Sequence, residues 1–164
     1  MRADVIARVW RRLGGRMQWR ALWLAHATFM VAVIGVVRDD GDRILLLRHK
    51  FWTGNPWGLP SGYVRCGETA AQALAREVHE ETGLRLDDAL IIGVRTGFRL
   101  RVEIVLAGRI TDTAKPRLSR TEIADLCWGT ESELASRLRA HHKELIELAW
   151  ESGERDCELR QEGD

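Results

Sequence analysis

The chain has 164 residues, of which 45% are hydrophobic and 30% charged, and its formal net charge is +1. This length and composition predict one globular domain, and the balanced charge argues against a general nucleic-acid coat protein. The three cysteines, Cys66, Cys127 and Cys157, lack the spacing of a zinc site and the even number of a disulfide framework. They favour a reducing compartment, so we expect a cytoplasmic protein.

Residues 1–26 form a basic, tryptophan-rich extension, in which six arginines accompany a single acidic residue. We expect a helix over about residues 3–24, weakened at Gly14-Gly15. A mostly apolar run follows Arg20, a pattern that a signal peptide or a short membrane anchor also shows. His26 and Thr28 interrupt this run, which is marginal for a bilayer span, so no stable membrane span is expected.

The sequence leaves three interpretations of this extension open. Its helix can pack on the rest of the chain, or on a second subunit in a homodimer, since tryptophans offer large apolar surfaces. Attachment to anionic lipid is the third interpretation, because arginines and tryptophans together suit a membrane surface.

The domain expected over residues 27–152 begins with two strands. The β-branched run "FMVAVIGVV" predicts a buried strand over about residues 28–37, and "RILLLRHK" predicts a second strand over 43–50. Between them lies "DDGD", where Asp40-Gly41 is expected to supply the positive φ angles of a hairpin turn.

A helix with well-marked ends is expected after the second strand. The chain first passes through a loop rich in glycine, proline and aromatic residues over 51–62, and then an extended Tyr63-Val64. Thr69 is a good N-cap, and Gln72 three residues later completes a capping box. Gly83 stands where a glycine commonly ends a helix.

This helix is expected to carry an apolar face and a separate acidic face. At 100° per residue, one apolar stripe is formed by Ala71, Leu74, Ala75 and Val78, and it should pack on the core. The acidic residues Glu77, Glu80 and Glu81 are expected on a different side. Glu77 and Glu81 are four residues apart and repel one another, so a group outside the helix should compensate their charge.

The remaining elements mix strands and helices without a regular βαβ alternation. We expect strands over 89–98 and 99–110, a polar loop over 111–121, a strand over 122–129, a helix over 131–152 and a polar tail over 153–164. The predicted fold class is therefore α/β of the α+β type, with a mixed β-sheet sandwiched between α-helices.

The carboxylates of the central helix can serve two purposes. Glu77, Glu80 and Glu81, with Glu68 one turn before the helix, offer the hard oxygen ligands that Mg²⁺ or Mn²⁺ prefers. No histidine or cysteine at ligand spacing competes with them. Alternatively, Arg76 and Glu80 form an ordinary surface ion pair four residues apart, and the acids are a solvated face.

The spacing of these residues resembles a known motif. Gly62, five residues, Glu68, seven residues and then "REVHEETGL" over 76–84 match all nine specified positions of the Nudix box, GX5EX7REUXEEXGU with U apolar. The order of strands and helices over about residues 27–140 is also similar to a Nudix hydrolase domain of the MutT type. One departure is Ser61, where many members have glycine, and it lies outside the nine positions.

The resemblance implies a metal site built from the box. It makes Glu77, Glu80 and Glu81 ligands of Mg²⁺ or Mn²⁺, with the carbonyl of Gly62 able to assist. Glu68 and Arg76 are then expected to orient the ligands and the box loop, as metal sites generally require.

The general base that the resemblance requires has several candidates. A box glutamate, Glu80 or Glu81, is one option, and a carboxylate from a loop beyond the later strands is another. Glu122, at the end of the 111–121 loop, is the first external candidate, ahead of Asp125. Glu103 lies within a strand pattern and is expected to have a structural or metal-supporting role.

The candidates for substrate contacts are chosen only by their positions in the chain. Arg48, after the apolar run of its strand, is a candidate for phosphate binding. Trp52 and Tyr63 are candidates for stacking on a base, and their alternative role is to anchor the loop on the core.

The function implied is divalent-metal-dependent hydrolysis of a pyrophosphate bond by metal-activated water. The substrate is a nucleotide-type small molecule, namely a nucleoside diphosphate linked to another moiety, such as a nucleoside triphosphate, a nucleotide sugar or ADP-ribose. The alternatives are a non-catalytic nucleotide-sensing Nudix module and an isoprenoid diphosphate isomerase. The sequence shows no added DNA-binding domain and no arrangement of cysteines that suits the isomerase.

Overall fold

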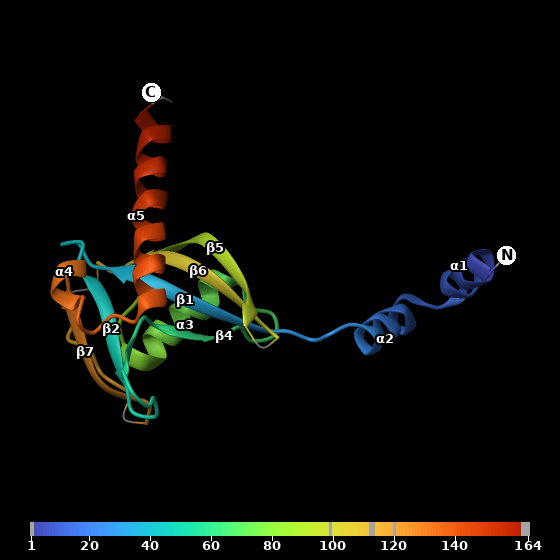
Figure 1. Ribbon diagram of the computed structural model, residues 1–164, viewed down its shortest axis with the longest axis horizontal. Helices are drawn as coiled ribbons and strands as arrows, with labels where there is room; N and C mark the ends of the chain where they lie inside the picture. The colour runs from blue at the N-terminus through green and yellow to red at the C-terminus, as the bar shows by residue number, and fades with distance from the viewer. Residues whose placement is uncertain (1, 99, 112–113, 120, 162–164) are drawn as a thin grey trace.

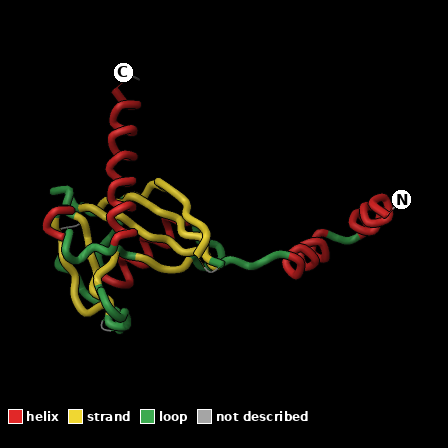
Figure 2. The backbone as a smooth tube through the Cα atoms, in the orientation of Figure 1, coloured by secondary structure: helices red, strands yellow, loops and turns green. Residues whose placement is uncertain are grey.

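The structure is a computed structural model, and it describes residues 2–98, 100–111, 114–119 and 121–161. Its strands form one mixed sheet with helices against both faces (Figures 1 and 2). The elements in chain order are α1 (Arg2–Arg12), α2 (Gly15–Ala25), β1 (Met30–Arg38), β2 (Ile44–His49), β3 (Trp57–Gly58), β4 (Ser61–Tyr63), α3 (Ala70–Thr82), β5 (Asp88–Phe98), β6 (Arg101–Arg109), β7 (Ile123–Gly129), α4 (Glu131–Leu134) and α5 (Ala140–Gln161). The predicted fold class is confirmed.

The two central strands are buried on both faces. On β1, Val33 and Val37 belong to the core under α3, whereas Ile34 and Val36 belong to the core that contains α5. Strand β2 alternates in the same way, with Leu45 and Leu47 in the first core and Ile44 and Leu46 in the second. Strands covered on both sides appear as continuous apolar runs in a sequence, which is the pattern from which they were predicted.

The order of the strands places α3 beside β4. Along the sheet the order is β3-β2-β1-β6-β5, while β4 pairs with β1 and β7 pairs with β2. Strands β1 and β6 are parallel, from Met30 opposite Arg101 to Arg38 opposite Arg109, and the other pairings are antiparallel. A parallel pair needs a crossover connection, and α3 lies within it, against the face of the sheet.

Helix α3 begins and ends at the residues that its sequence predicts. The hydroxyl of Thr69 accepts from the backbone N–H of Gln72, and the Gln72 side chain accepts from the backbone N–H of Thr69, which completes the capping box. Gly83 ends the helix in the left-handed conformation, with φ of 72°. The helix is therefore fixed at both ends by local interactions.

The face of α3 that meets the core differs from the expectation. Leu74 and Val78 are buried as predicted, but the fully buried alanine is Ala73, while Ala71 and Ala75 are half-buried. The buried set also includes Glu81, which is 4% exposed. The prediction that all three box glutamates lie on a separate side is thus wrong for Glu81.

The hairpin turn between β1 and β2 uses a different residue for its positive φ. Asp42 has φ of 55°, whereas Asp40 and Gly41 keep negative values, so the prediction for Asp40-Gly41 is wrong. The carboxylate of Asp39 accepts from the backbone N–H groups of Gly41 and Arg43. An aspartate that bonds to its own turn stabilises this conformation without a glycine at the left-handed position.

The helix expected over 131–152 is two helices. Thr130 caps the four-residue α4, and a turn over 135–139 separates it from α5. Helix α5 then continues to Gln161, through most of the segment expected to be a polar tail. The prediction of one helix ending at 152 is therefore wrong at both points.

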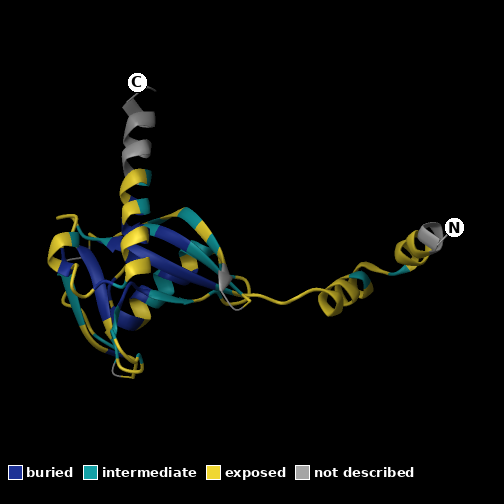
Figure 3. Cartoon of the chain, viewed as in Figure 1, coloured by how far each residue is buried: buried dark blue, intermediate teal, exposed yellow. Residues whose placement is uncertain are grey.

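The N-terminal extension consists of two helices that stand away from the sheet, with a break at Gly14 (Figure 1). None of their described side chains is buried, so packing of this segment on the rest of the chain is not observed (Figure 3). Among the described residues, no helix has both the length and the apolar character needed to cross a membrane.

Candidate functional site

The site is built where β4 passes alongside α3. Gly62 of β4 pairs with Val33 of β1, and Glu77 of α3 faces it. A Cβ added at Gly62 would lie 2.0 Å from the Glu77 carboxyl carbon and 2.1 Å from its Oε1. Only glycine therefore allows the carboxylate to lie directly against the backbone of β4.

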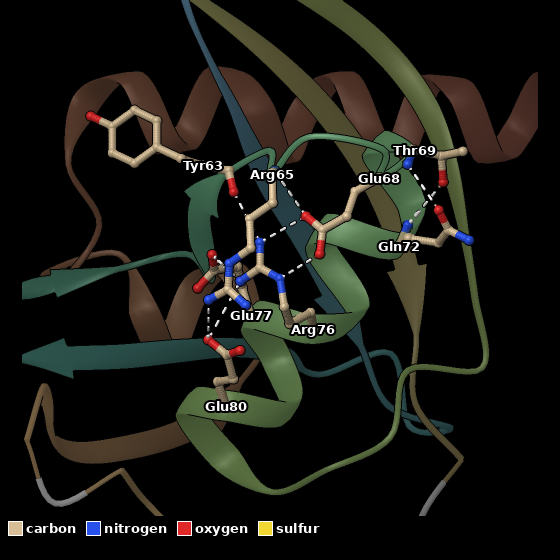
Figure 4. Close-up of polar contacts among 8 residues, drawn as sticks. All are labelled: Tyr63, Arg65, Glu68, Thr69, Gln72, Arg76, Glu77 and Glu80. Carbon is tan, nitrogen blue, oxygen red and sulfur yellow. Dashed lines mark hydrogen bonds and ion pairs between the residues drawn. The ribbon is translucent and has the colours of Figure 1, made fainter.

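One guanidinium joins the box loop to the helix. The Arg76 Nε and Nη2 atoms donate to Glu68 over 2.7 and 3.0 Å, and Nη1 donates to Glu77 over 2.6 Å (Figure 4). Nη2 also donates to the backbone carbonyl of Tyr63 over 2.9 Å. A planar group with five donors can hold two carboxylates and a carbonyl at once, so Arg76 orients both sides of the site.

Glu68 closes the loop that precedes α3. Its Oε2 atom accepts from the backbone N–H of Arg65 over 2.9 Å, in addition to the two bonds from Arg76. The hydrogen bonds from Arg76 and then from Arg65 lower the pKa of Glu68 to about 2. Glu68 is thus a fixed anion that holds Arg76 in place, and Arg76 has a correspondingly raised pKa.

Glu80 lies at the open side of the site. Its side chain is 46% exposed, and its Oε2 atom lies 3.2 Å from the Arg65 guanidinium and 3.4 Å from that of Arg76 (Figure 4). Sequence reasoning missed Arg65. A basic residue inside a loop surrounded by acids is a signal that could have identified it.

Glu81 is a buried carboxylate with one oxygen atom that lacks a hydrogen-bond partner in the described part of the chain. It is 4% exposed, and its Oε2 atom has no hydrogen-bond partner. Burial raises its pKa to about 8, and the negative charges of Glu77, Glu122 and Glu80 add to this effect in that order. Two of these neighbours are box residues, so the repulsion expected from the sequence is concentrated on Glu81.

The loop before β7 brings Glu122 to the same end of α3. The backbone N–H of Ser119 donates to the carbonyl of Glu81 over 3.0 Å, and that of Arg117 donates to Thr82 over 2.7 Å. Glu122 is exposed and close enough for its charge to act on Glu81. Asp125 is exposed on β7, and Glu103 on β6 pairs with Arg101 over 2.8 Å. Of the three external acids, only Glu122 is among the charges that raise the Glu81 pKa.

The donor set fits a divalent cation, although its arginine contacts must shift. No three His, Cys, Asp or Glu side chains in the described part of the chain are grouped so that they could hold a metal ion in their present positions. Arg76 and Arg65 hold two of the box carboxylates instead. The buried, unpartnered oxygen of Glu81 and the carboxylate of Glu77, which lies against the backbone of Gly62, nevertheless provide the hard oxygen donors that Mg²⁺ and Mn²⁺ accept.

The three residues proposed to bind the substrate lie in different surroundings. Tyr63 is 49% exposed beside the box loop, and the Arg101 guanidinium lies 5.6 Å from its ring centroid. Arg48 is exposed on β2, opposite Trp57 and Asp125 in the two neighbouring strands. Only Tyr63 is therefore joined to the box by a described contact, through its carbonyl.

Trp52 packs against the last residue of β2 and the turn before α5. Its ring stacks on His49 with centroids 3.8 Å apart, and the Arg139 guanidinium lies 4.3 Å from the centroid of the Trp52 ring. A Cβ on Gly58 would lie 2.5 Å from the Trp52 ring. These contacts favour the loop-anchoring interpretation of Trp52 over the base-stacking one.

A family model describes this arrangement of strands, loop and helix. The NUDIX domain model matches residues 28–149. The chain belongs to the Nudix hydrolase family. The resemblance inferred from the box is therefore confirmed, and the Nudix match includes both the box and the loop that carries Glu122.

Individual Nudix proteins are similar to parts of this chain. The NAD-capped RNA hydrolase NudC of Mycobacterium tuberculosis is 33% identical over 110 residues, which are 66% of this chain and 35% of that protein. The ADP-ribose pyrophosphatase of Methanocaldococcus jannaschii is 43% identical over 68 residues, which are 39% of this chain and 38% of that protein. The chain thus aligns with little more than a third of the length of either relative.

A solved structure shows the same fold. The Nudix domain of Shewanella oneidensis NrtR, complexed with ADP ribose, superposes with a TM-score of 0.66 at 18% identity. The alignment covers 89% of this chain and 97% of that domain. At 18% sequence identity this comparison supports a shared fold and nothing further.

Proposed function

We propose that the chain is a divalent-metal-dependent hydrolase that cleaves a pyrophosphate bond in a nucleoside diphosphate linked to another moiety. Membership of the Nudix family supports this class of reaction. Relatives named as an NAD-capped RNA hydrolase and an ADP-ribose pyrophosphatase support a nucleotide-type substrate. The catalytic unit is residues 27–152, and the proposed location is the cytoplasm.

The observation that carries the proposal is the carboxylate of Glu81. A buried acid with an unpartnered oxygen and three negative neighbours is costly in the absence of a cation. Glu77 lies against the bare backbone of Gly62, and Glu80 lies at the open side. These glutamates, with the Gly62 carbonyl, are the residues that would hold Mg²⁺ or Mn²⁺.

The bound ion would supply a Lewis acid that polarises the phosphoryl group and makes a nucleophilic water available. The residues of the chain orient the reacting groups and accept a proton. Glu68 fixes Arg76, and Arg76 fixes Glu77 and the Tyr63 carbonyl, so the helix and the box loop keep their relative position. Glu122 accepts a proton as the external base, with Glu80 and Glu81 as the alternatives within the box.

Substrate binding uses groups at the rim of the site. Tyr63 offers an exposed ring beside the box, and Arg48 offers a guanidinium that suits a phosphate. Trp52 is the weakest of the three candidates because its ring is already occupied by His49 and Arg139.

The test is turnover of a panel of nucleoside triphosphates, nucleotide sugars and ADP-ribose with Mg²⁺ or Mn²⁺. Glu81→Gln keeps the size of the side chain and removes its charge, and we expect its kcat/KM to fall at least about a hundredfold. Chelation of the ion should abolish turnover by the wild type. The matched control is Glu147→Gln, an exposed glutamate of α5, which should retain activity.

The outcomes separate hydrolysis from nucleotide sensing. If the folded wild type binds a nucleotide but turns over none of the panel with either ion, the chain is a sensing module and the proposal is wrong. If Glu81→Gln retains full activity, the assignment of Glu81 to the site is wrong. Activity of Glu122→Gln, measured against pH, decides whether the external base is correctly placed.

A further inference from the structure

The N-terminal helices expose an unusual amount of apolar surface. From Ile6 to Met30 no side chain is buried, and only Leu13 and Gln18 are half-buried (Figure 3). The exposed large apolar residues of this stretch are Ile6, Val9, Trp10, Met17, Trp19, Leu22, Trp23, Leu24, Phe29 and Met30. So many exposed large apolar side chains within one segment indicate a surface that docks on a partner.

Helix α1 separates its apolar and basic residues onto two faces. Ile6, Val9, Trp10 and Leu13 recur at spacings of three and four, which places them along one side of the helix. Arg8, Arg11 and Arg12 recur in the same way on the opposite side. A helix with an apolar face containing tryptophan and a face rich in arginine suits the boundary between water and a bilayer.

Helix α2 repeats this composition with more aromatic surface. Trp19 and Trp23 are four residues apart, and their side chains are 72% and 63% exposed. Arg16 and Arg20 are also four residues apart and lie on a neighbouring face. Tryptophan favours the headgroup level of a membrane because its ring is large and apolar and its N–H is polar.

The domain is also apolar at the start of β1, where the chain arrives from α2. Phe29, Met30 and Leu100 are 52%, 55% and 56% exposed. The backbone N–H of Met30 donates to the carbonyl of Leu100 over 2.9 Å, so these residues are adjacent at the start of β1 and the β5–β6 turn. The part of the domain nearest the helices in the chain therefore also exposes apolar side chains.

Charge decides which partner fits this surface. Six arginines and one aspartate lie in residues 1–26, while the whole chain has a formal net charge of only +1, so the rest of the chain is net negative. In a pair of copies joined through these helices, two segments that each carry six arginines and a single acidic residue would repel one another. Nucleic acid would neutralise the arginines but leave the exposed aliphatic residues, such as Leu22 and Leu24, without an apolar partner.

We propose that α1 and α2 lie in the headgroup region of an anionic phospholipid bilayer and hold the Nudix domain at its surface. The apolar face of Ile6, Val9, Trp10 and Leu13, together with Trp19 and Trp23, enters the acyl boundary. The arginines contact lipid phosphates, and each adds to the attraction while it lies within a Debye length of the surface. The helices lie on the bilayer and do not cross it.

The experiment is flotation of the full chain with vesicles of phosphatidylcholine alone, or of phosphatidylcholine with about 30% phosphatidylglycerol, a fraction chosen to give a substantial negative surface potential. We expect at least tenfold stronger partitioning to the anionic vesicles at low salt, and a marked loss at about 0.5 M salt, where the Debye length is short. The double variant W19S/W23S removes apolar surface, and R11Q/R12Q removes charge. Each should weaken partitioning to anionic vesicles at least about tenfold.

Matched variants on the domain serve as controls. Phe51→Ser removes a side chain that is 77% exposed, and K115Q/K143Q removes two exposed positive charges outside α1 and α2. Both should partition as the wild type does. Circular dichroism checks that each variant is folded, and hydrolysis of a water-soluble nucleotide should be unchanged in W19S/W23S. Flotation measures vesicle binding and not hydrolysis, so the result does not depend on the proposed function.

Three results would overturn the proposal. In the first, the wild type fails to float with anionic vesicles at low salt. In the second, W19S/W23S and the Phe51→Ser control partition equally. In the third, the chain sediments as a dimer that W19S/W23S converts to a monomer while vesicles bind neither form, which would assign the surface to a second copy.

Discussion

At the scale of single residues, the site depends on how a few charges are held. Arg76 is placed by Glu68 and in turn holds Glu77 and the Tyr63 carbonyl. A lysine at position 76 would offer one ammonium in place of the planar fork, and it would lose the paired contacts with Glu68. The identity of this residue therefore matters more than its charge.

Gly62 gives the sharpest prediction at this scale. Its φ lies outside the left-handed region, so alanine can adopt its backbone conformation, but the added Cβ would lie 2.0 Å from the Glu77 carboxyl carbon. In Gly62→Ala the Glu77 side chain must move away from β4. We expect kcat/KM to fall about ten- to a hundredfold, with a higher Mg²⁺ or Mn²⁺ concentration needed for half-maximal activity.

The control for this substitution is Gly14→Ala, because a Cβ on Gly14 meets no atom within 4 Å. This variant should keep both the activity and the metal requirement of the wild type. If Gly62→Ala keeps them too, the close approach of Glu77 to β4 has no part in binding the ion.

The burial of Glu81 was not predicted, although a signal for it is present. Leu74, Val78 and Glu81 are spaced by four and three residues, so they lie along one side of α3. The acidic pattern suggested a separate face because charged residues are rarely buried without a partner. The functional site is where that rule fails, since the cost of burial is offset when an ion binds.

At the scale of elements, local signals determined some boundaries and not others. The caps at Thr69 and Gly83 lie within a few residues of the bonds that they make, so the sequence was enough to place α3. The break between α4 and α5 is stabilised by the loop after β2, because Asn55 donates to the carbonyl of Arg137 and accepts from Arg139 through its own carbonyl. Contacts between positions more than 80 residues apart leave no local pattern.

The capping box of α3 is itself testable. Thr69→Ala removes the hydroxyl that accepts from the backbone N–H of Gln72, and we expect the free energy of unfolding to fall by about 1 kcal/mol. Thr69→Ser retains the hydroxyl and should lose much less. Urea denaturation of the two variants measures the difference, and equal losses would show that the cap does not stabilise the fold.

At the scale of the whole molecule, the sequence predicted a mixed sheet between helices but not the order of its strands. The apolar runs of β1 and β2 indicate burial on both faces, and they say nothing about which strands become neighbours. The parallel pairing of β1 with β6 joins segments about 70 residues apart, a separation long enough for the crossover connection that contains α3. Likewise, the separation of α1 and α2 from the domain could not be read from their composition.

Two histidines, His142 and His49, have no role in the proposed function. His142 of α5 is 3% exposed, and its Nδ1 atom has no hydrogen-bond partner among the described residues. Burial lowers its pKa to about 3, and the charges of His141, Arg139 and His49 act in the same direction. Burial, with a contribution from Arg139, also lowers the pKa of His49 to about 4. Both side chains are therefore neutral in the folded protein at pH 7.

Each of these two histidines should accordingly lower the free energy of unfolding as the pH falls, whereas the raised pKa of Glu81 acts in the opposite direction. An unfolded histidine takes up a proton near pH 6.5, whereas folded His142 does so only near pH 3, so the unfolded state binds more protons between these values. We expect His142 to cost the wild type about 1–2 kcal/mol of unfolding free energy between pH 7 and pH 5, a loss that His142→Gln should lack. Urea denaturation at both pH values measures this difference. Parallel pH profiles for wild type and His142→Gln would show that His142 takes up its proton equally in both states.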